Sequence, residues 1–243
     1  MVIVKTGKRF GLTTQEVWFA EADAQIPASN RTIFYQAHAV PKSNVYQIEE
    51  FHTLAIDLHQ PEETLHANIN RTFKSHIRKA EKLSITHRAL DMNNSKDTLS
   101  YQQSFAEFVK RKEIIPLPDW RLQALVQAGA LIITVIEKDG VPITFHAYVH
   151  DKIRVRLLTS HNTSQTIFNE NETGLCNKFH HWSDILYFKA AGFRWYDFGG
   201  LSKEEDNGRD YFKKSFGGER QVFYHFITCT GLLKLWFAVR RLL

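Results

Sequence analysis

Two adjacent lysines near the carboxyl end of the sequence lie between two glycine pairs. Lys213 and Lys214 are flanked by Gly199–Gly200 and Gly217–Gly218. Glycine lets the backbone approach a ligand closely, and a lysine supplies a cation that can stabilise an oxyanion or a phosphate. Lys213, with Phe212 packing inward beside it, is therefore our candidate for that contact. The alternative for both lysines is a solvated helix face.

Asp197 ends a short strand-like run, residues 193–198, directly before the first glycine pair. A carboxylate at a strand end could accept a proton from an amine or orient it. The alternative is an Asx turn, in which the side chain bonds the backbone and shapes the loop. We treat Asp197 as the second candidate catalytic residue.

A basic stripe accompanies a predicted helix over residues 62–83. The helix begins at Pro61, and its apolar residues recur at helical spacing: Leu65, Ile69, Phe73, Ile77 and Ala80. The basic residues recur beside them at steps of three and four: Arg71, Lys74, Arg78 and Lys82. They could contact phosphates of a nucleotide, a tRNA or a lipid diphosphate, or they could form an ordinary solvated face.

The histidines do not predict a metal site. His180 and His181 are adjacent in a predicted helix over residues 173–191 and therefore point about 100° apart, so they cannot both bind one ion. No third ligand stands at a metal-binding spacing, and we expect no metal. Trp182 lies on the inner face of the same helix, where a core position is the alternative to a role in binding.

Composition indicates a globular protein with a modest positive charge. The chain has 243 residues, of which 43% are hydrophobic and 23% charged, and its formal net charge is +5. This balance favours anionic partners such as phosphorylated substrates, nucleic acid or a membrane surface. The two cysteines form no CxxC pair, which is typical of a reducing compartment. Because the sequence shows neither a secretory signal nor a run of apolar residues long enough to span a membrane, we expect a cytoplasmic protein.

The order of predicted elements favours an α+β fold with one central mixed sheet flanked by helices. Helices are expected over residues 62–83, 97–112, 119–128 and 173–191. A three-stranded meander is expected over residues 131–159, with a hairpin turn at Asp139–Gly140. Residues 32–40, 44–58, 193–198 and 221–230 are expected to add strands, with a short helix before the last of them.

The final segment, residues 231–243, is predicted to form an apolar helix that carries three basic residues. Such a helix could lie on the inner, anionic face of a membrane, which would suit a lipid-linked acceptor. A helix docked on the protein core is the alternative.

Two blocks of the sequence resemble the Fem-type aminoacyltransferases. That family has an Asn-x4-Trp helix, a Tyr-Asp-Phe-Gly-Gly strand end and then a Tyr-x-Phe-Lys-x2-Phe-Gly-Gly segment. The matching positions are Asn177, Trp182, Tyr196, Asp197, Phe198, Gly199, Gly200, Phe212, Lys213, Phe216, Gly217 and Gly218. One spacing departs, because Tyr211 adjoins Phe212 directly. The upstream block, residues 68–82, resembles the Asn-rich, Arg-Lys-Ala-Glu helix of the same group.

The resemblance implies a GNAT-like (N-acetyltransferase-like) fold, with a trimmed tandem of two such units as one form. We expect a partial unit over residues 1–115 and a catalytic unit over residues 116–243, or one continuous domain. The implied activity is N-acyl transfer from acyl-CoA (acetyl-CoA included) or aminoacyl-tRNA to a phosphorylated or lipid-linked acceptor of the cell envelope. Tyr196, Gly199, Gly200, Phe212 and Trp182 would then bind substrate or donor.

Two other functions remain open from the sequence. One is a nucleic-acid-binding module that uses the basic helix over residues 62–83, whose affinity would fall steeply with salt. The other is a degenerate scaffold that kept the fold and lost the chemistry.

Overall fold

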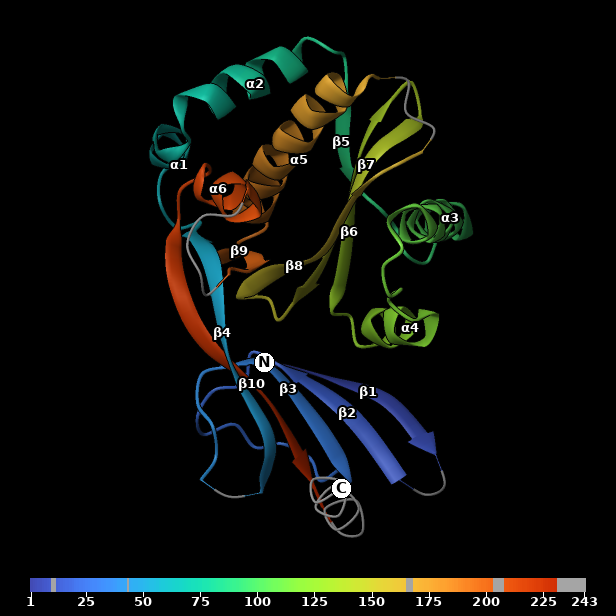
Figure 1. The fold of residues 1–243 in the computed structure, drawn as a ribbon, viewed down its shortest axis with the longest axis vertical. Coiled ribbons are helices and arrows are strands. Elements are labelled where there is room, and N and C mark those ends of the chain that lie inside the picture. Colours follow the sequence, from blue (N-terminus) through green and yellow to red (C-terminus); the bar gives the residue numbers. More distant parts are fainter. Residues whose placement is uncertain (10–11, 43, 165–167, 203–207, 231–243) are drawn as a thin grey trace. The chain divides into compact units, whose positions relative to one another are not determined.

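The computed structural model of the protein describes residues 1–9, 12–42, 44–164, 168–202 and 208–230 (Figure 1). The chain forms two compact units, and each unit is assembled from separate stretches of sequence. The first contains Met1–Thr53, Pro118–Ala130 and the chain from Arg220, and the second contains Leu54–Leu117 and Leu131–Glu219. The strands β4 and β10 each begin in one unit and end in the other. The division predicted between residues 115 and 116 stays a prediction.

Within its described residues, the first unit is a sheet with one helix. Its strand order is β1-β2-β3-β10-β4, where β2 and β3 run parallel while β1–β2 and β3–β10 are antiparallel. The strands are β1 Val2–Arg9, β2 Leu12–Trp18, β3 Arg31–Ala37, β4 Val45–Asp57 and β10 Glu219–Cys229, and the helix is α4 Asp119–Gln127. The strands β1 and β2 were not predicted.

The second unit carries the predicted meander. From the end of β4 its strand order is β9-β8-β7-β6-β5, and β8–β9 is parallel while the other described pairs are antiparallel. The strands are β5 Thr86–Ala89, β6 Leu131–Lys138, β7 Val141–His150, β8 Arg154–Asn162 and β9 Trp195–Gly200. The turn at Asp139–Gly140 has both residues at positive φ, as an Asp-Gly hairpin requires.

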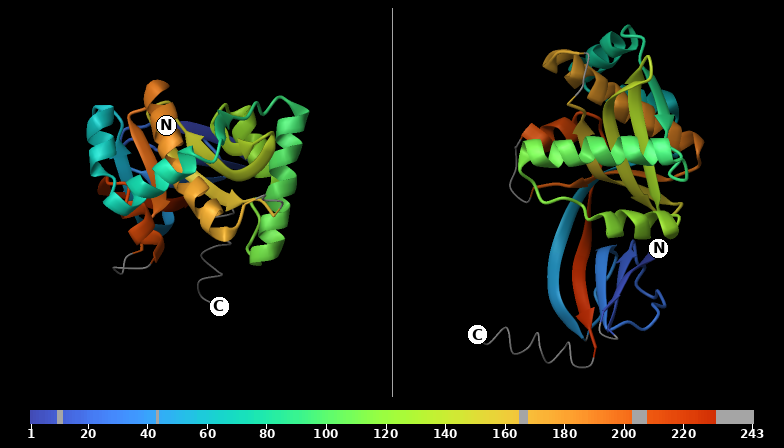
Figure 2. Two further views of the ribbon diagram at one scale, coloured as in Figure 1. Left: turned by 90° about the horizontal axis from the view of Figure 1, so that it is seen from above. Right: turned by 90° about the vertical axis from the view of Figure 1, so that its right-hand side faces the viewer.

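Helices cover both faces of the meander (Figures 1 and 2). Side chains of β7 alternate, so that Phe145 contacts Tyr101 of α3 (Ser95–Lys112) while Thr144 bonds His180 of α5 (Glu170–Ala190). A capping box formed by Asn169 and Glu172 starts α5. The predicted α+β class with a mixed sheet flanked by helices is therefore confirmed.

The single helix predicted over residues 62–83 is two helices, α1 Glu62–Asn68 and α2 Arg71–Glu81. Ile69 is extended, and the side chain of Asn70 caps α2 by accepting a hydrogen bond from Phe73 N at 2.8 Å. The apolar stripe is nevertheless buried as predicted: Leu65, Ile69, Phe73, Ile77 and Ala80. Four of these five, all but Ala80, join Trp182, Ile185 and Phe188 of α5 in the main core.

The helix predicted over residues 231–243 lies outside the described residues. Among the residues that the structure does describe, no helix is both long enough and apolar enough to cross a membrane.

Candidate functional site

Lys213 occupies a half-buried position at the end of β9. It lies on the short helix α6 (Gly208–Lys214), and its Nζ donates a hydrogen bond to the carbonyl oxygen of Gly200. Burial lowers the pKa of Lys213, with Arg156 and Arg209 acting in the same direction and the acids Asp210 and Asp197 opposing them. The side chain thus turns toward the end of β9, and its role in holding an anion stays a prediction.

The first glycine pair forms a turn shaped by Asp197. Its Oδ1 accepts a hydrogen bond from Gly199 N at 2.7 Å, and its Oδ2 lies 2.7 Å from Nη1 of Arg154. Both partners of this ion pair are buried. Gly199 has φ +75°, and a side chain there would lie 3.2 Å from the Leu157 carbonyl oxygen. This geometry is that of the Asx turn, and the catalytic role of Asp197 stays a prediction.

The second glycine pair is required by the packing of the chain on itself. Gly217 and Gly218 have φ +84° and +101°. An added Cβ would meet Asn68 Cβ at 2.8 Å in the first case and the Ala55 carbonyl oxygen at 2.7 Å in the second. These two glycines therefore let the end of α6 pack closely against β4 and α1, and their lack of a side chain is explained by this packing without a ligand.

Asn70 ties the junction of α1 and α2 to the same place. Its Nδ2 donates to Ser215 Oγ at 2.7 Å, and its backbone N donates to the Ser215 carbonyl at 2.9 Å. Ser215 Oγ in turn donates to the Tyr211 carbonyl at 2.8 Å. The segment that follows Lys213 is thus held by two hydrogen bonds from the Asn-rich block.

The predicted binding aromatics have different environments. Phe212 is half-buried and packs on Phe73, on Phe216 and on the ring of His181, whose centroid is 5.3 Å away. Trp182 is 7% exposed and belongs to the core, and Tyr196 is fully buried. The core alternative therefore describes the position of Trp182, and a binding role for the buried Tyr196 stays a prediction.

The predicted basic stripe lies on the outer face of α2. Arg71, Arg78 and Lys82 are exposed, and Lys74 Nζ donates to the carbonyl of Ala67 at 2.8 Å. A solvated face and a phosphate-binding face would both have this placement, so the binding role stays a prediction.

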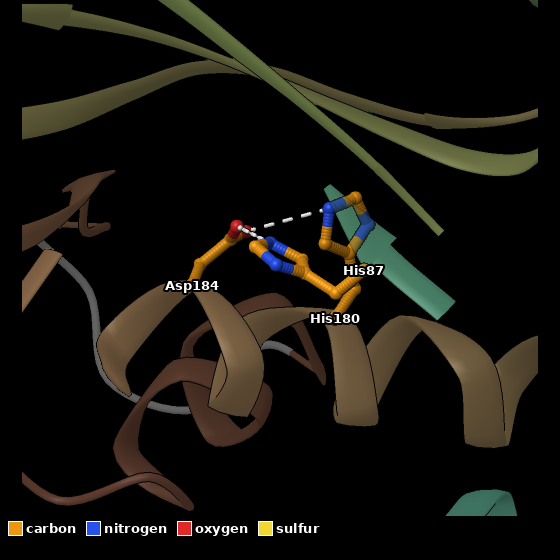
Figure 3. Close-up of side chains that lie close together, drawn as sticks. All are labelled: His87, His180 and Asp184. Atoms are coloured by element: carbon orange, nitrogen blue, oxygen red, sulfur yellow. Dashed lines mark hydrogen bonds and ion pairs between the residues drawn. The ribbon is translucent and has the colours of Figure 1, made fainter. Parts of the chain in front are cut away.

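A buried polar network centred on Asp184 was not predicted. The carboxylate is fully buried on α5 and has three hydrogen-bond partners: His87 Nε2 at 2.7 Å, His146 Nδ1 at 2.7 Å and the Tyr148 hydroxyl at 2.6 Å. Figure 3 shows His87 and His180 converging on this carboxylate from β5 and from α5. The network lies in the same unit as Lys213.

Electrostatics keep Asp184 ionised. Burial alone would raise the pKa of this carboxyl, but the charges of His180 and His146 and the hydrogen bonds from His146 and His87 hold it well below its ordinary value. Burial, with the negative charge of Asp184, raises the pKa of Tyr148 well above normal. Tyr148 is therefore a neutral donor to an ionised acceptor.

The network continues from Asp184 toward α6. The Tyr148 hydroxyl lies 2.9 Å from that of Tyr196, and the Tyr196 hydroxyl lies 2.7 Å from His181 Nδ1. The ring of His181 contacts Phe198, Phe212 and Phe216, and the charge of Lys213 contributes to its electrostatic environment. His181 therefore joins the Asp184 network to the segment that holds Lys213.

Three residues of metal-ligating type come together in this network. Ligand atoms of His87, His180 and Asp184 all lie within 4.8 Å of one another. Donor atoms around a tetrahedral zinc lie roughly 3.3 Å apart, given Zn–N distances of about 2.0 Å, whereas His87 Nε2 and Asp184 Oδ1 are 2.7 Å apart. His180 is bonded through both ring nitrogens, to Thr134 at 2.9 Å and Thr144 at 2.6 Å. This is the geometry of a hydrogen-bonded network, and we assign no metal ligands.

Two sequence signals could have revealed that polar residues are buried here, although not which of them are partners. His180 and His181 precede Asp184 on α5 by four and three residues, so the three side chains lie on neighbouring parts of the helix surface. His146 and Tyr148 are two residues apart and point to the same face of β7. Polar residues at positions where a buried helix and a central strand meet indicate a buried hydrogen-bonded group.

Comparison with known proteins identifies the fold. No protein-family model and no curated protein matches the sequence. FemX matches with a TM-score of 0.58 at 13% identity, over 76% of this chain and 64% of that one. The C-terminal domain (DUF2156) of a protein described as a lysylphosphatidylglycerol synthetase, from Agrobacterium fabrum, matches with a TM-score of 0.57 at 14% identity, over 86% of this chain and 72% of that one.

A further match is L-PGS from Bacillus licheniformis, with a TM-score of 0.55 at 13% identity, over 86% of this chain and 72% of that chain. This chain thus spans less than two thirds of FemX and about seven tenths of the two other structures. At these identities the likeness concerns the fold. The chain has the fold shared by FemX, the DUF2156 domain and L-PGS, which supports the predicted Fem-like architecture.

Proposed function

We propose that this protein transfers an acyl or aminoacyl group from an activated donor to an amine. The observation that carries the proposal is the position of Lys213, half-buried and bonded to Gly200 at the end of β9, in a chain with the fold of FemX. A cation in this position suits an oxyanion. The sequence shows no nucleophile motif, and direct attack by an amine needs none.

The reaction joins the nitrogen of the amine to the carbonyl carbon of the donor. A tetrahedral oxyanion forms, the bond to the donor's sulfur or ribose oxygen breaks, and the amine loses a proton. Lys213 would stabilise the oxyanion, and losing one such donor typically raises the barrier by about 3–4 kcal/mol. Gly199, Gly200 and Phe212 would shape the place where the reacting group lies.

The donor is an acyl-CoA, acetyl-CoA included, or an aminoacyl-tRNA, and the acceptor is an amino group of a cell-envelope precursor. An amino sugar, a peptidoglycan peptide or a lipid-linked amine has this chemistry. Two neighbours in fold, described as a lysylphosphatidylglycerol synthetase and as L-PGS, support an envelope acceptor. The exposed Arg71, Arg78 and Lys82 could then meet the phosphates of the donor or acceptor.

The experiment supplies the purified protein with labelled acetyl-CoA, longer acyl-CoAs or charged tRNA, together with an envelope extract. We expect label in a product that resists hydroxylamine, as an amide does and an ester does not. Lys213→Ala should lower the initial rate about 100-fold or more, while the matched control Lys214→Ala, at the exposed neighbouring residue, should stay within about twofold of the unaltered protein.

Two outcomes would contradict the proposal. One is the absence of labelled product with every donor, and the other is an unchanged rate for Lys213→Ala. Salt-dependent binding of nucleic acid without any transfer would instead support the binding module that uses α1 and α2.

A further inference from the structure

The single hydrogen of each hydroxyl fixes how the buried network is connected. Asp184 is ionised, so its Oδ2 accepts, and Tyr148 must donate its one hydrogen there. The Tyr148 oxygen then accepts from the hydroxyl of Tyr196, because a contact of 2.9 Å between two oxygens without a hydrogen would be repulsive.

The same count fixes the tautomer of His181. Tyr196 has given its hydrogen to Tyr148, so its oxygen can only accept from His181 Nδ1, 2.7 Å away. His181 therefore carries its hydrogen on Nδ1. Burial, with the charges of His146 and Lys213, lowers the pKa of His181 well below its ordinary value, against the opposing effect of Asp184. The ring is neutral at pH 7, and Nε2 bears a lone pair.

Nε2 is the ring nitrogen left for a substrate, and the charge of Lys213 acts on this ring. In the described part of the chain His181 Nε2 has no hydrogen-bond partner, while Nδ1 is committed to Tyr196. The ring is walled by Phe198, Phe212 and Phe216. Of these three, Phe212 alone is only half-buried, and it is adjacent to Lys213.

From this geometry we infer that His181 Nε2 accepts the proton of the attacking amine, and that Tyr196, Tyr148 and Asp184 are positioning residues that hold its tautomer. The inference rests on the proposed acyl transfer. As the C–N bond forms, the amine proton passes to Nε2 and the ring becomes an imidazolium. When the C–S or C–O bond breaks, the same proton passes to the departing thiolate or ribose oxygen. The Nδ1–H bond stays directed at Tyr196 throughout, and the charge of Asp184 offsets the imidazolium, as in other acid–base sites where an acid supports a histidine.

A measurement that does not involve catalysis tests the tautomer. In protein labelled with ¹⁵N-histidine, long-range ¹H–¹⁵N spectra distinguish a protonated from an unprotonated ring nitrogen, and His181→Gln identifies the signals of His181. We expect hydrogen on Nδ1 and none on Nε2 at pH 7. Tyr196→Phe should lose this preference. Hydrogen on Nε2 of His181 in the unaltered protein would overturn the inference, whether or not any transfer is observed.

Kinetics test the role of His181. His181→Gln should lower kcat by about 10²–10⁴-fold, the usual contribution of a general base. Tyr196→Phe should lower kcat by about tenfold or more while KM stays within about twofold, because it displaces the base and not the substrate. The matched control is His161→Gln, which alters another buried histidine outside the network.

The pH profile adds a readout that a structural role would not change. The titratable and charged groups around His181 are His146 on β7, Asp184 and His180 on α5, Tyr196 on β9 and Lys213 on α6. The acid limb of kcat should lie below pH 6.5 in the unaltered protein and should be absent in His181→Gln. An unchanged rate and acid limb in a folded His181→Gln protein would overturn the inference. A total absence of transfer alongside the expected tautomer would instead count against the proposed function.

Discussion

Asp197 carries its charge in a fully buried position, and groups of the protein itself hold both of its oxygens. The carboxylate is shared between Arg154 and the backbone of Gly199. A carboxylate committed in this way fixes the β9 turn on which Lys213 rests. At the scale of single residues, Asp197 and Lys213 thus differ: Asp197 holds the turn through both of its oxygens, whereas Lys213 bonds the turn from outside, at the carbonyl of Gly200.

Asp197→Asn should therefore lower the stability of the folded protein. Asparagine can still accept the hydrogen bond from Gly199 N, but it leaves the buried Arg154 guanidinium without this carboxylate. We expect the free energy of unfolding to fall by about 3–5 kcal/mol, measured by urea denaturation. The matched control, Glu81→Gln at an exposed residue of α2, should stay within about 0.5 kcal/mol, and equal stability of the two variants would contradict the assignment.

The helices of the second unit are held by contacts that a helical pattern alone does not contain. The two glycines after α6 and the asparagine before α2 meet where the Lys213 segment turns into β10. Each can be tested separately, because the contacts of each involve different atoms.

Gly218→Ala should be strongly destabilising. The position has φ +101°, and the new Cβ would lie 2.7 Å from the Ala55 carbonyl oxygen, where only a backbone shift could relieve the contact. We expect a loss of about 2–3 kcal/mol. Gly174→Ala, within α5 and with only the end of Lys178 nearby at 3.8 Å, should instead stabilise the protein by about 0.5–1 kcal/mol. Thermal unfolding of the two variants in opposite directions would confirm the difference, and a shift of the same sign would contradict it.

Asn70→Ala should cost more than the loss of a helix cap. Asn70 caps α2 and also bonds Ser215, whereas Asn94 caps α3 through an exposed bond to Lys96 N. Each cap contributes about 1 kcal/mol, and the Ser215 bond adds about 1 kcal/mol more. Asn70→Ala should therefore destabilise the protein by about 1 kcal/mol more than Asn94→Ala in the same urea titration. Equal losses would mean that the bond to Ser215 contributes nothing.

The molecule as a whole should become less stable in mild acid. Burial lowers the pKa of His180 and His181 well below 6.5 and that of His161 to about 3. Between these folded-state values and pH 6.5 the unfolded chain binds more protons, so the free energy of unfolding falls as the pH falls. The lowered pKa of Asp184 acts in a different window, since its contribution is present above about pH 3.8 and is lost below it.

Denaturant titrations at several pH values test this prediction. Each buried histidine should contribute a slope of up to about 1.4 kcal/mol per pH unit. His161→Gln should remove the contribution of one histidine. A free energy of unfolding that is constant between pH 6.5 and pH 4 would show that these rings are not neutral in the folded protein.

What could be predicted from the sequence depends on how many residues of the chain each signal spans. The meander, α3, α4 and α5 could be predicted because apolar spacing, a turn and a terminal glycine lie within a few residues of each other. Lys213 could be proposed as a site residue for the same reason, because the glycine pairs lie close to it in the sequence. The break at Ile69–Asn70 was missed because the apolar stripe continues across it, since both helices bury the same core. The strands β1 and β2 were missed because polar and charged residues interrupt their apolar positions, so that no regular alternation indicates a buried face.

The network around Asp184 could not be assembled from spacing. His87, His146 and Asp184 are 97 and 38 residues apart in the pairs that bond, so their proximity arises only when β5, β7 and α5 pack together. A lone histidine on an apolar strand gives no sign of its partner. The sequence thus indicated the charged group that we propose to face a ligand, whereas the buried network became visible only in the fold.

The pairing of β3 with β10 has a consequence for how the protein is made. Phe34 stands opposite Phe226, so β3 leaves the ribosome about 190 residues before its neighbour exists, and such distant pairings form slowly. Until then the first strands expose an unfinished edge, which invites aggregation. The nascent chain should therefore depend on a chaperone that binds unfinished chains at the ribosome for longer than its modest size would suggest.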